Sequence, residues 1–141
     1  MLENRWLDLT TITWTSLSSD RAMPDPRTWF AASSVGMKFI LFGGYAPLGI
    51  ILDDTWLGSL SMMPNSAYDV VWSQAVVAGS SPNGRFNAAA CESIGMFFLH
   101  GGQGSPTGDL KNPLLDDFWK VFYCMRDLNS NVLLLFLFFV L

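Results

Sequence analysis

Few residues of this chain have side chains that could do chemistry, namely one histidine, His100, and two aspartate pairs, Asp53-Asp54 and Asp116-Asp117. Histidine and carboxylate oxygens can bind a metal ion, and two carboxyl groups of different pKa can act as general acid and general base. A single histidine, however, supplies too few converging ligands for a metal centre. The segment 101–104 (GGQG) lacks the lysine and the following helix of a phosphate-binding loop. The sequence therefore predicts no catalytic residues, no metal and no cofactor.

The aspartate pairs occupy equivalent places in an internal repeat, which explains them better than acid-base chemistry does. Four landmarks recur at one spacing of 58 residues: Trp14 and Trp72, Arg27 and Arg85, Gly43 and Gly101, Gly44 and Gly102. The pattern Asp-Asp-x-Trp recurs at 63 residues, in segments 53–56 and 116–119, because the loop before it is longer in the second copy. The segment 6–9 (WLDL), with Trp14 after it, matches the end of an earlier copy. Repeats of this length indicate units that bury their apolar faces against one another.

The elements that must position these residues are short β-strands. Runs of β-branched, aromatic and small residues alternate with glycine, proline and asparagine, which set turns. The expected strands are 30–35, 38–42, 55–60 and 70–75 in the first copy, and 85–92, 95–100 and 116–122 in the second. No stretch before residue 120 shows a sustained helical period. The sequence predicts an all-β fold with about four strands per unit.

The ordered pattern of these landmarks resembles the kelch repeat, the blade unit of kelch and galactose-oxidase-type β-propellers. The first copy has Pro26-Arg27, then 42–44 (FGG), 53–56 (DDTW) and Trp72, and the second copy has Gly84-Arg85, then 98–102 (FLHGG) and 116–119 (DDFW). The resemblance covers about residues 1–122. It implies a partial β-propeller of kelch-type four-stranded antiparallel blades, followed by a non-repeat apolar C-terminal tail. The implied divisions are 1–22 (end of a preceding blade), 23–78 (one repeat), 79–122 (an incomplete repeat) and 123–141 (the tail).

The resemblance gives structural roles to most of the recurring residues. Four tryptophans are expected to fill the space between blades: Trp14, Trp56, Trp72 and Trp119. The glycine pairs Gly43-Gly44 and Gly101-Gly102 close the second strand of each blade. Arg27 and Arg85 can bond carbonyls or carboxylates of a neighbouring turn, for which Asp54 and Asp117 are natural partners or turn caps. The copper site of galactose oxidase needs tyrosine and histidine ligands, whereas His100 stands at the position of Phe42 and is expected to be a packing residue.

The function that the resemblance implies is a protein-protein interaction module, a scaffold or adaptor that binds partners through loops at the propeller faces. The three candidate loops are 45–52, 103–115 and 61–69, which can equally be solvated connectors. Six candidate contact residues lie in the first two loops: Tyr45, Pro47, Leu48, Gln103, Ser105 and Lys111. One alternative is the propeller portion of a larger enzyme, such as a kelch-linked phosphatase, methyltransferase or ubiquitin-ligase adaptor, with no activity of its own. A second alternative is a truncated product without function.

The charge and the composition of the chain exclude some classes of binding partner. The net charge is −4 and no cluster of basic residues is present, which argues against nucleic acid. The ten apolar residues 132–141 are too few for a membrane-spanning helix, which needs about 20, so we do not expect the chain to cross a membrane. The alternative is a hydrophobic hook for a membrane or a partner. Cys91 and Cys124 form no disulfide framework, and Cys91 is expected as a buried free thiol in a cytoplasmic protein.

The length of the chain limits the number of blades that it can form. A closed propeller has about 4–8 blades, whereas 141 residues supply two near-complete blades and the end of another. We therefore expect a fragment of a longer propeller, copies that self-associate through open blade edges, or partner blades that come from elsewhere.

Overall fold

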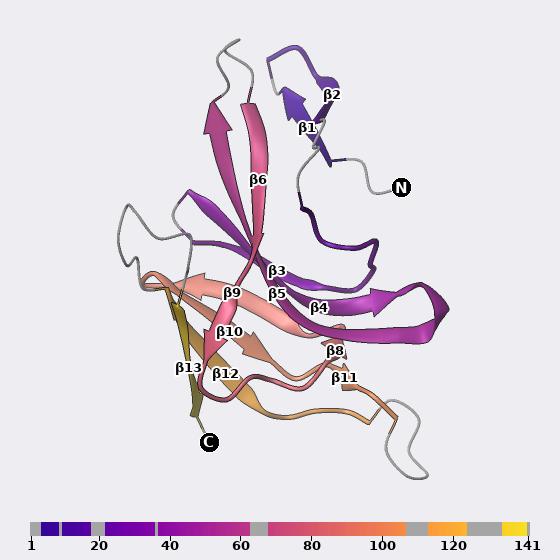
Figure 1. The fold of residues 1–141 in the computed structure, drawn as a ribbon, viewed down its shortest axis with the longest axis vertical. Coiled ribbons are helices and arrows are strands. Elements are labelled where there is room, and N and C mark those ends of the chain that lie inside the picture. The colour runs from indigo at the N-terminus through magenta and orange to yellow at the C-terminus, as the bar shows by residue number, and fades with distance from the viewer. Residues whose placement is uncertain are drawn as a thin grey trace.

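The computed structural model describes residues 4–8, 10–17, 22–35, 37–62, 68–106, 113–123 and 134–140. The regular structure of these residues is β-strand apart from one 3-10 turn, η1 (Pro47–Gly49), so the predicted all-β class is confirmed (Figure 1). The strands are β1 (Asn4–Asp8), β2 (Thr13–Leu17), β3 (Ala31–Val35), β4 (Lys38–Ala46), β5 (Ile50–Met62), β6 (Tyr68–Gln74), β7 (Val76–Ala78), β8 (Arg85–Phe86), β9 (Ala89–Ser93), β10 (Met96–His100), β11 (Gln103–Gly104), β12 (Phe118–Tyr123) and β13 (Leu134–Val140).

The first sheet is a four-stranded antiparallel meander in the order β3-β4-β5-β6. The small residues of β3 pair with β4, from Ala31 opposite Phe42 to Val35 opposite Lys38. Strands β4 and β5 continue past the expected boundaries, because the segment 45–52 is mostly paired backbone with only η1 at its tip. The segment 45–52 is therefore a rigid hairpin end rather than a long loop.

The second sheet has the order β7-β13-β12-β10-β9 and repeats the first, with β9, β10, β12 and β13 in the places of β3, β4, β5 and β6. Strand β13 comes from the apolar tail and pairs antiparallel with β12, from Phe118 opposite Val140 to Tyr123 opposite Leu135. The sequence division at residue 122 separates this segment from the second repeat, whereas in the structure it pairs with β12 on one side and with β7 on the other. A run of apolar β-formers can satisfy the free backbone groups of β12 without the tryptophan that marks β6.

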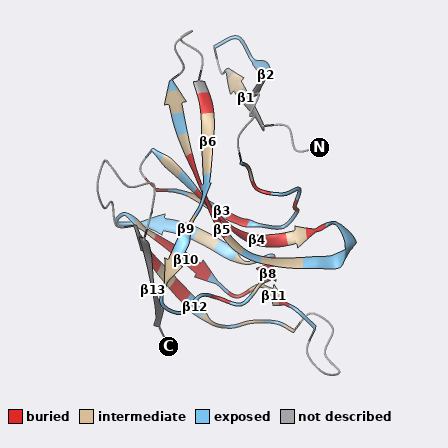
Figure 2. Cartoon of the chain, in the orientation of Figure 1, coloured by how far each residue is buried: buried red, intermediate tan, exposed pale blue. Residues whose placement is uncertain are grey.

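The two sheets lie face to face and share one apolar core. Its buried members come from β3, β4 and β5 on one side and from β10 and β12 on the other: Ala31, Val35, Ile40, Phe42, Leu57, Phe97, Leu99, Trp119 and Val121. Figure 2 shows buried segments along β4, β10 and β12, where the sheets meet. Each sheet therefore buries one face against its neighbour, as expected for stacked repeat units.

The N-terminal hairpin is not part of either sheet and lies next to β6 of the first sheet (Figure 1). Strands β1 and β2 pair with each other, with Leu7 opposite Trp14. Trp14 is 64% exposed, so the expectation that its ring fills an interface is wrong for the chain described here. The prediction of a buried thiol is also wrong, because Cys91 is exposed on β9. Both errors have one cause, since a strand has two faces and the repeat pattern does not say which of them is covered.

Candidate interaction face

Arg27 holds the end of the first sheet together through a set of hydrogen bonds that we call the first arginine clamp. Its guanidinium donates from Nη1 and Nη2 to the two carboxylate oxygens of Asp54, with 2.9 Å for the Nη2 bond. It also donates to the carbonyl oxygens of Gly43, at 3.1 Å, and of Asp25, at 3.0 Å. The indole Nε1 of Trp56 donates to Oδ2 of Asp54 at 2.6 Å. A planar guanidinium suits such bidentate recognition, because its donors form a fixed fork.

The second arginine clamp reproduces this geometry in the second sheet. Arg85 donates to both carboxylate oxygens of Asp117, with 2.8 Å for the Nη2 bond. It donates to the carbonyl oxygens of Gly101, at 2.9 Å, and of Asn83, at 3.1 Å. The indole of Trp119 donates to Asp117 at 2.6 Å. Both arginine side chains are only 1% exposed, so the charges are paired inside the protein.

The clamps lower the pKa of both aspartates below the ordinary value of 3.8. Burial acts to raise the pKa of Asp54, but the hydrogen bonds from Arg27 and Trp56 and the charge of Arg27 outweigh it. For Asp117 the hydrogen bonds from Arg85 are the largest effect, opposed by burial and supported by Trp119. Both carboxyl groups are ionised at neutral pH and occupied by their donors, which leaves neither available as a general acid.

A β-bulge brings Asp54 to its arginine. The register shifts between Phe42, which pairs with Thr55, and Gly44, which pairs with Leu52, so that Asp53 and Asp54 together oppose Gly43. Bulges of this kind redirect side chains at the end of a ladder. Gly43 has φ +61°, and a Cβ there would stand 2.6 Å from the carbonyl oxygen of Arg85. Glycine is thus required both for the backbone conformation and for the close approach of the second unit.

The end of the molecule that carries the clamps also presents exposed apolar side chains, and we call it the clamp-side face. The rings of Trp29, Tyr45 and Phe86 form a cluster with centroid separations of 5.4–5.8 Å. Beside it lies an open depression of about 400 Å³. Its lining comes from the segment before β3 and from the β4–β5 hairpin end: Pro26, Arg27, Thr28, Tyr45, Ala46, Pro47 and Leu48. Trp29 is 57% and Leu48 99% exposed.

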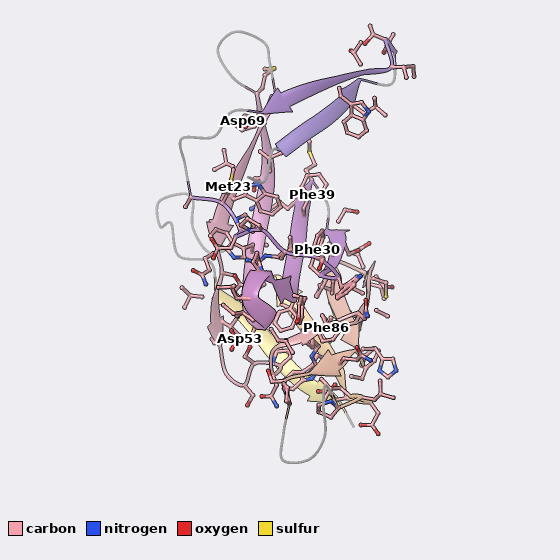
Figure 3. All side chains as sticks on the ribbon, turned by 90° about the vertical axis from the view of Figure 1, so that its right-hand side faces the viewer. Met23, Phe30, Phe39, Asp53, Asp69 and Phe86 are labelled. Carbon is pink, nitrogen blue, oxygen red and sulfur yellow. The ribbon has the colours of Figure 1, made fainter. Side chains whose placement is uncertain are left out.

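The structure brings together candidate contact residues from both repeats. Tyr45 packs on Phe86, which pairs across the β-ladder with Gln103. Ser105 follows on the same connection and is exposed. Lys111 lies outside the described residues. Asp69, from the third candidate loop, lies far from Asp53 and Phe86 (Figure 3), and residues 63–67 of that loop lie outside the described residues.

The sequence did not single out Trp29, which is exposed, or Phe86, which is 5% exposed and packs against Trp29 from within the protein. Each follows a clamp arginine by one or two residues; Phe86 lay in the expected strand 85–92, whereas Trp29 lay just before the expected strand 30–35. The repeat could have pointed to Trp29, because this residue corresponds to Asn87 in the second copy. Both residues have a left-handed backbone conformation, with φ 52° and 56°. Their units are joined there, since the amide of Asn87 donates to the carbonyl of Trp29 at 2.8 Å.

The remaining landmarks have packing or solvent-exposed positions. Trp72 lies over Gly58, where a Cβ would meet its ring at 2.9 Å, and its Nε1 is buried with no hydrogen-bond partner among the described residues. His100 is exposed, with Nδ1 3.1 Å from the carbonyl oxygen of Asp117. In the described ranges no three histidine, cysteine or acidic side chains are grouped as metal ligands would be. Within the same ranges no helix is long and apolar enough to cross a membrane.

Comparison with known proteins gives one informative likeness. The chain is 31% identical over 124 residues to Tip elongation aberrant protein 1 of Schizosaccharomyces pombe, a kelch-repeat protein. The aligned region is 88% of this chain and 10% of the yeast protein, so the chain spans about a tenth of that relative. No family model matches the chain. The likeness agrees with the kelch resemblance of the sequence.

Proposed function

We propose that this chain is a kelch-type protein-interaction module in which the two stacked sheets are propeller blades and the clamp-side face binds a protein partner. The recurring landmarks, the likeness to a kelch-repeat protein and the antiparallel four-stranded order support the blade assignment. In this proposal the five described candidates, Tyr45, Pro47, Leu48, Gln103 and Ser105, contact the partner. Lys111 joins them as a candidate from the same connection.

The observation that carries the proposal is the combination of exposed apolar side chains with a rigid support. Leu48 and Trp29 both have left-handed backbones, with φ 66° and 52°, a conformation that disfavours large side chains. Such strain persists where surrounding structure fixes it, and it clusters at binding sites. Arg27 of the first clamp lines the depression, and the carbonyl of Trp29 accepts a hydrogen bond from the amide of Asn87 at 2.8 Å. Large exposed apolar groups gathered beside a depression are characteristic of interaction sites.

The chemistry of the face indicates the kind of partner. The depression is bordered by the rings of Pro26, Tyr45 and Pro47 and by the Leu48 side chain, so it suits an apolar side chain of an extended peptide segment. Asp53 is exposed near the same end, which favours a basic residue next to that apolar anchor. We therefore propose a peptide with an apolar anchor and a neighbouring lysine or arginine.

The test is selection of a displayed peptide library against the full chain, followed by affinity measurements with the selected peptides. The double variant Trp29→Ala/Leu48→Asp should weaken binding at least about tenfold, which is about 1.4 kcal/mol. Met62→Asp is the matched control, because Met62 is 69% exposed near the opposite end and should leave affinity unchanged. Equal binding by wild type and double variant would refute the proposed face, and so would selected peptides without the apolar-basic pattern.

In this proposal the module binds its partner and catalyses no reaction, because the aspartate carboxylates of the two clamps are ion-paired with arginines. We also propose a cytoplasmic setting, where an exposed free thiol such as Cys91 stays reduced.

A further inference from the structure

The chain contains two serines that are followed directly by proline, in the dipeptides Ser81-Pro82 and Ser105-Pro106. Proline has no backbone N–H, and it favours an extended conformation of the residue before it. Proline-directed protein kinases act on serines of this kind, and they need both residues to be accessible. The structure places the two dipeptides in different surroundings, which separates a usable site from a protected one.

The first dipeptide is held by the core. Pro82 is buried and borders a small void of about 10 Å³ between the two sheets, which Phe97 and Trp119 also line. Three residues after Pro82, the side chain of Arg85 is 1% exposed in the second arginine clamp. The backbone that follows Ser81 is therefore fixed inside the protein. A kinase would have to separate the two sheets to contact this proline.

The second dipeptide lies at the surface, since Ser105 and Pro106 are both exposed. They follow the last residue of β11, Gly104, which pairs with Arg85 and donates its amide to the carbonyl oxygen of Pro113 at 2.9 Å. The paired backbone of β11 ends there, so the serine and the proline stand outside the ladder on a fixed base. Exposed positions of this kind next to a rigid scaffold are accessible to other proteins.

We propose that Ser105 is a phosphorylation site for a proline-directed serine/threonine kinase, and that its phosphate changes the charge of the clamp-side face. In the reaction, Oγ of Ser105 forms a bond to the γ-phosphorus of ATP, and the bond from that phosphorus to the β–γ bridging oxygen breaks. ADP leaves with the electron pair of that bond, and the hydroxyl proton passes to the catalytic aspartate of the kinase. The fold protects Ser81 from the same reaction.

The position of Ser105 connects the modification with the clamp-side face. Gln103, two residues earlier, pairs with Phe86, whose ring centroid lies 5.4 Å from that of Tyr45. Asp53 is exposed near the same end. A phosphoserine carries a charge of about −1.5 to −2 at pH 7, so it adds to this negative charge. The effect on binding rests on the proposed function, in which the partner peptide carries a lysine or arginine.

The test of the site is incubation of the full chain with a purified proline-directed kinase and Mg²⁺-ATP, followed by mass spectrometry of its peptides. Free peptides 76–87 and 100–111 are the reference substrates, and far-UV circular dichroism checks that the chain is folded. The rate in the chain relative to the rate in the free peptide should be at least about tenfold higher for Ser105 than for Ser81, because access to Ser81 needs local unfolding. Ser105→Ala should abolish the rapid labelling, whereas the matched control Ser81→Ala should leave it unchanged.

Two results would overturn the site. One is a folded chain that takes no phosphate at Ser105, whether or not peptide 100–111 is labelled. The other is equal relative labelling of Ser81 and Ser105, which would show that burial of Pro82 gives no protection.

The effect on binding is measured separately, with the peptides selected against the clamp-side face. The phosphorylated chain should bind them about two- to fivefold more tightly than the untreated chain at low salt, and the gain should disappear at high salt. Kinase-treated Ser105→Ala is the control. An affinity that is unchanged or weaker would overturn the effect of the phosphate on the face. Selected peptides that bind neither form would refute the proposed function and this effect with it, whereas phosphate on Ser105 would still establish the site.

Discussion

Replacing Arg85 with methionine removes the guanidinium of the second clamp while keeping much of its aliphatic volume. Arg85 is 1% exposed, and its side chain donates two hydrogen bonds to Asp117 and one each to the carbonyl oxygens of Asn83 and Gly101. The variant would leave the carboxylate with Trp119 as its remaining donor in the clamp. It would also leave both carbonyl oxygens without this donor.

The expected loss of stability follows from these contacts. Removing one partner of a buried ion pair costs about 3–5 kcal/mol, because the other charge stays buried and unpaired. The side chain of Asp117 is 22% exposed, so water can rehydrate part of the carboxylate. We therefore expect the lower end, about 3 kcal/mol. Arg85→Lys should recover less than half of the loss, since an ammonium keeps the charge but lacks the guanidinium fork.

The assay is urea unfolding followed by tryptophan fluorescence at one fixed protein concentration. Asp117→Asn and the double variant Arg85→Met/Asp117→Asn complete a double-mutant cycle, in which the double variant should lose less than the sum of the single losses. A loss below about 1 kcal/mol for Arg85→Met, or strictly additive losses, would show that the clamp does not stabilise the sheet.

Three further outcomes are expected. Trp119→Ala should lose about 3–5 kcal/mol of unfolding free energy, because the ring is buried between the sheets; Ile94→Ala, at an 88% exposed position, is the control, and a loss for Trp119→Ala as small as the control's would contradict the placement. Folding lowers the pKa of Asp117 below 3.8, so the contribution of this carboxylate to the free energy of unfolding is complete above pH 3.8 and declines as the pH falls through the folded pKa. In an acid titration, the free energy of unfolding should therefore fall less steeply for Asp117→Asn than for wild type. Parallel declines of the two proteins would contradict this prediction. Deleting residues 124–141 removes β13 and exposes the edge of β12, so solubility in sedimentation assays should fall; deletion of residues 1–21, whose hairpin pairs with itself, is the comparison, and unchanged solubility after the first deletion would argue against the strand.

The repeat landmarks made much of the fold predictable. An arginine, a glycine pair and Asp-Asp-x-Trp in one order restrict the backbone strongly, since the arginine must reach the aspartate and the glycines must pass close to neighbouring carbonyl groups. The strands between them followed from β-formers bounded by turn residues. The exposure of Trp14 and Cys91 did not follow, because it depends on what covers each face. Strand β13 could not be predicted either, because an apolar run can form a β-strand, a hydrophobic anchor for a membrane or partner, or a membrane-spanning segment.

The candidate face was less predictable than the fold. Tyr45, Pro47 and Leu48 were predicted as contact residues because they lie in a candidate loop between two expected strands. Trp29 was not singled out because an aromatic residue beside a strand is ordinarily core, as Phe86 is. Their position beside Tyr45 depends on how the two units stack, and no local pattern encodes that distance.

Comparison of the two repeats separates residues that build the clamps from residues that shape the face, and it leads to a last prediction. The clamp residues are identical in both copies, whereas Trp29 corresponds to Asn87 and Tyr45 to Gln103. The second unit thus shows that asparagine and glutamine are compatible with this backbone, including the left-handed φ at Asn87. Transferring them to the first unit, as Trp29→Asn/Tyr45→Gln, should cost only the lost ring contacts, about 0.5–1.5 kcal/mol per pair.

The same transfer should abolish binding of selected peptides, because it removes the rings beside the depression and leaves the clamps in place. Urea unfolding and peptide affinity measured on one preparation separate the two effects. A variant that keeps its affinity would refute the assignment of the face. A variant that loses about 3 kcal/mol or more of stability would instead assign Trp29 and Tyr45 to the fold, since that magnitude is typical of deleting buried core rings rather than surface contacts.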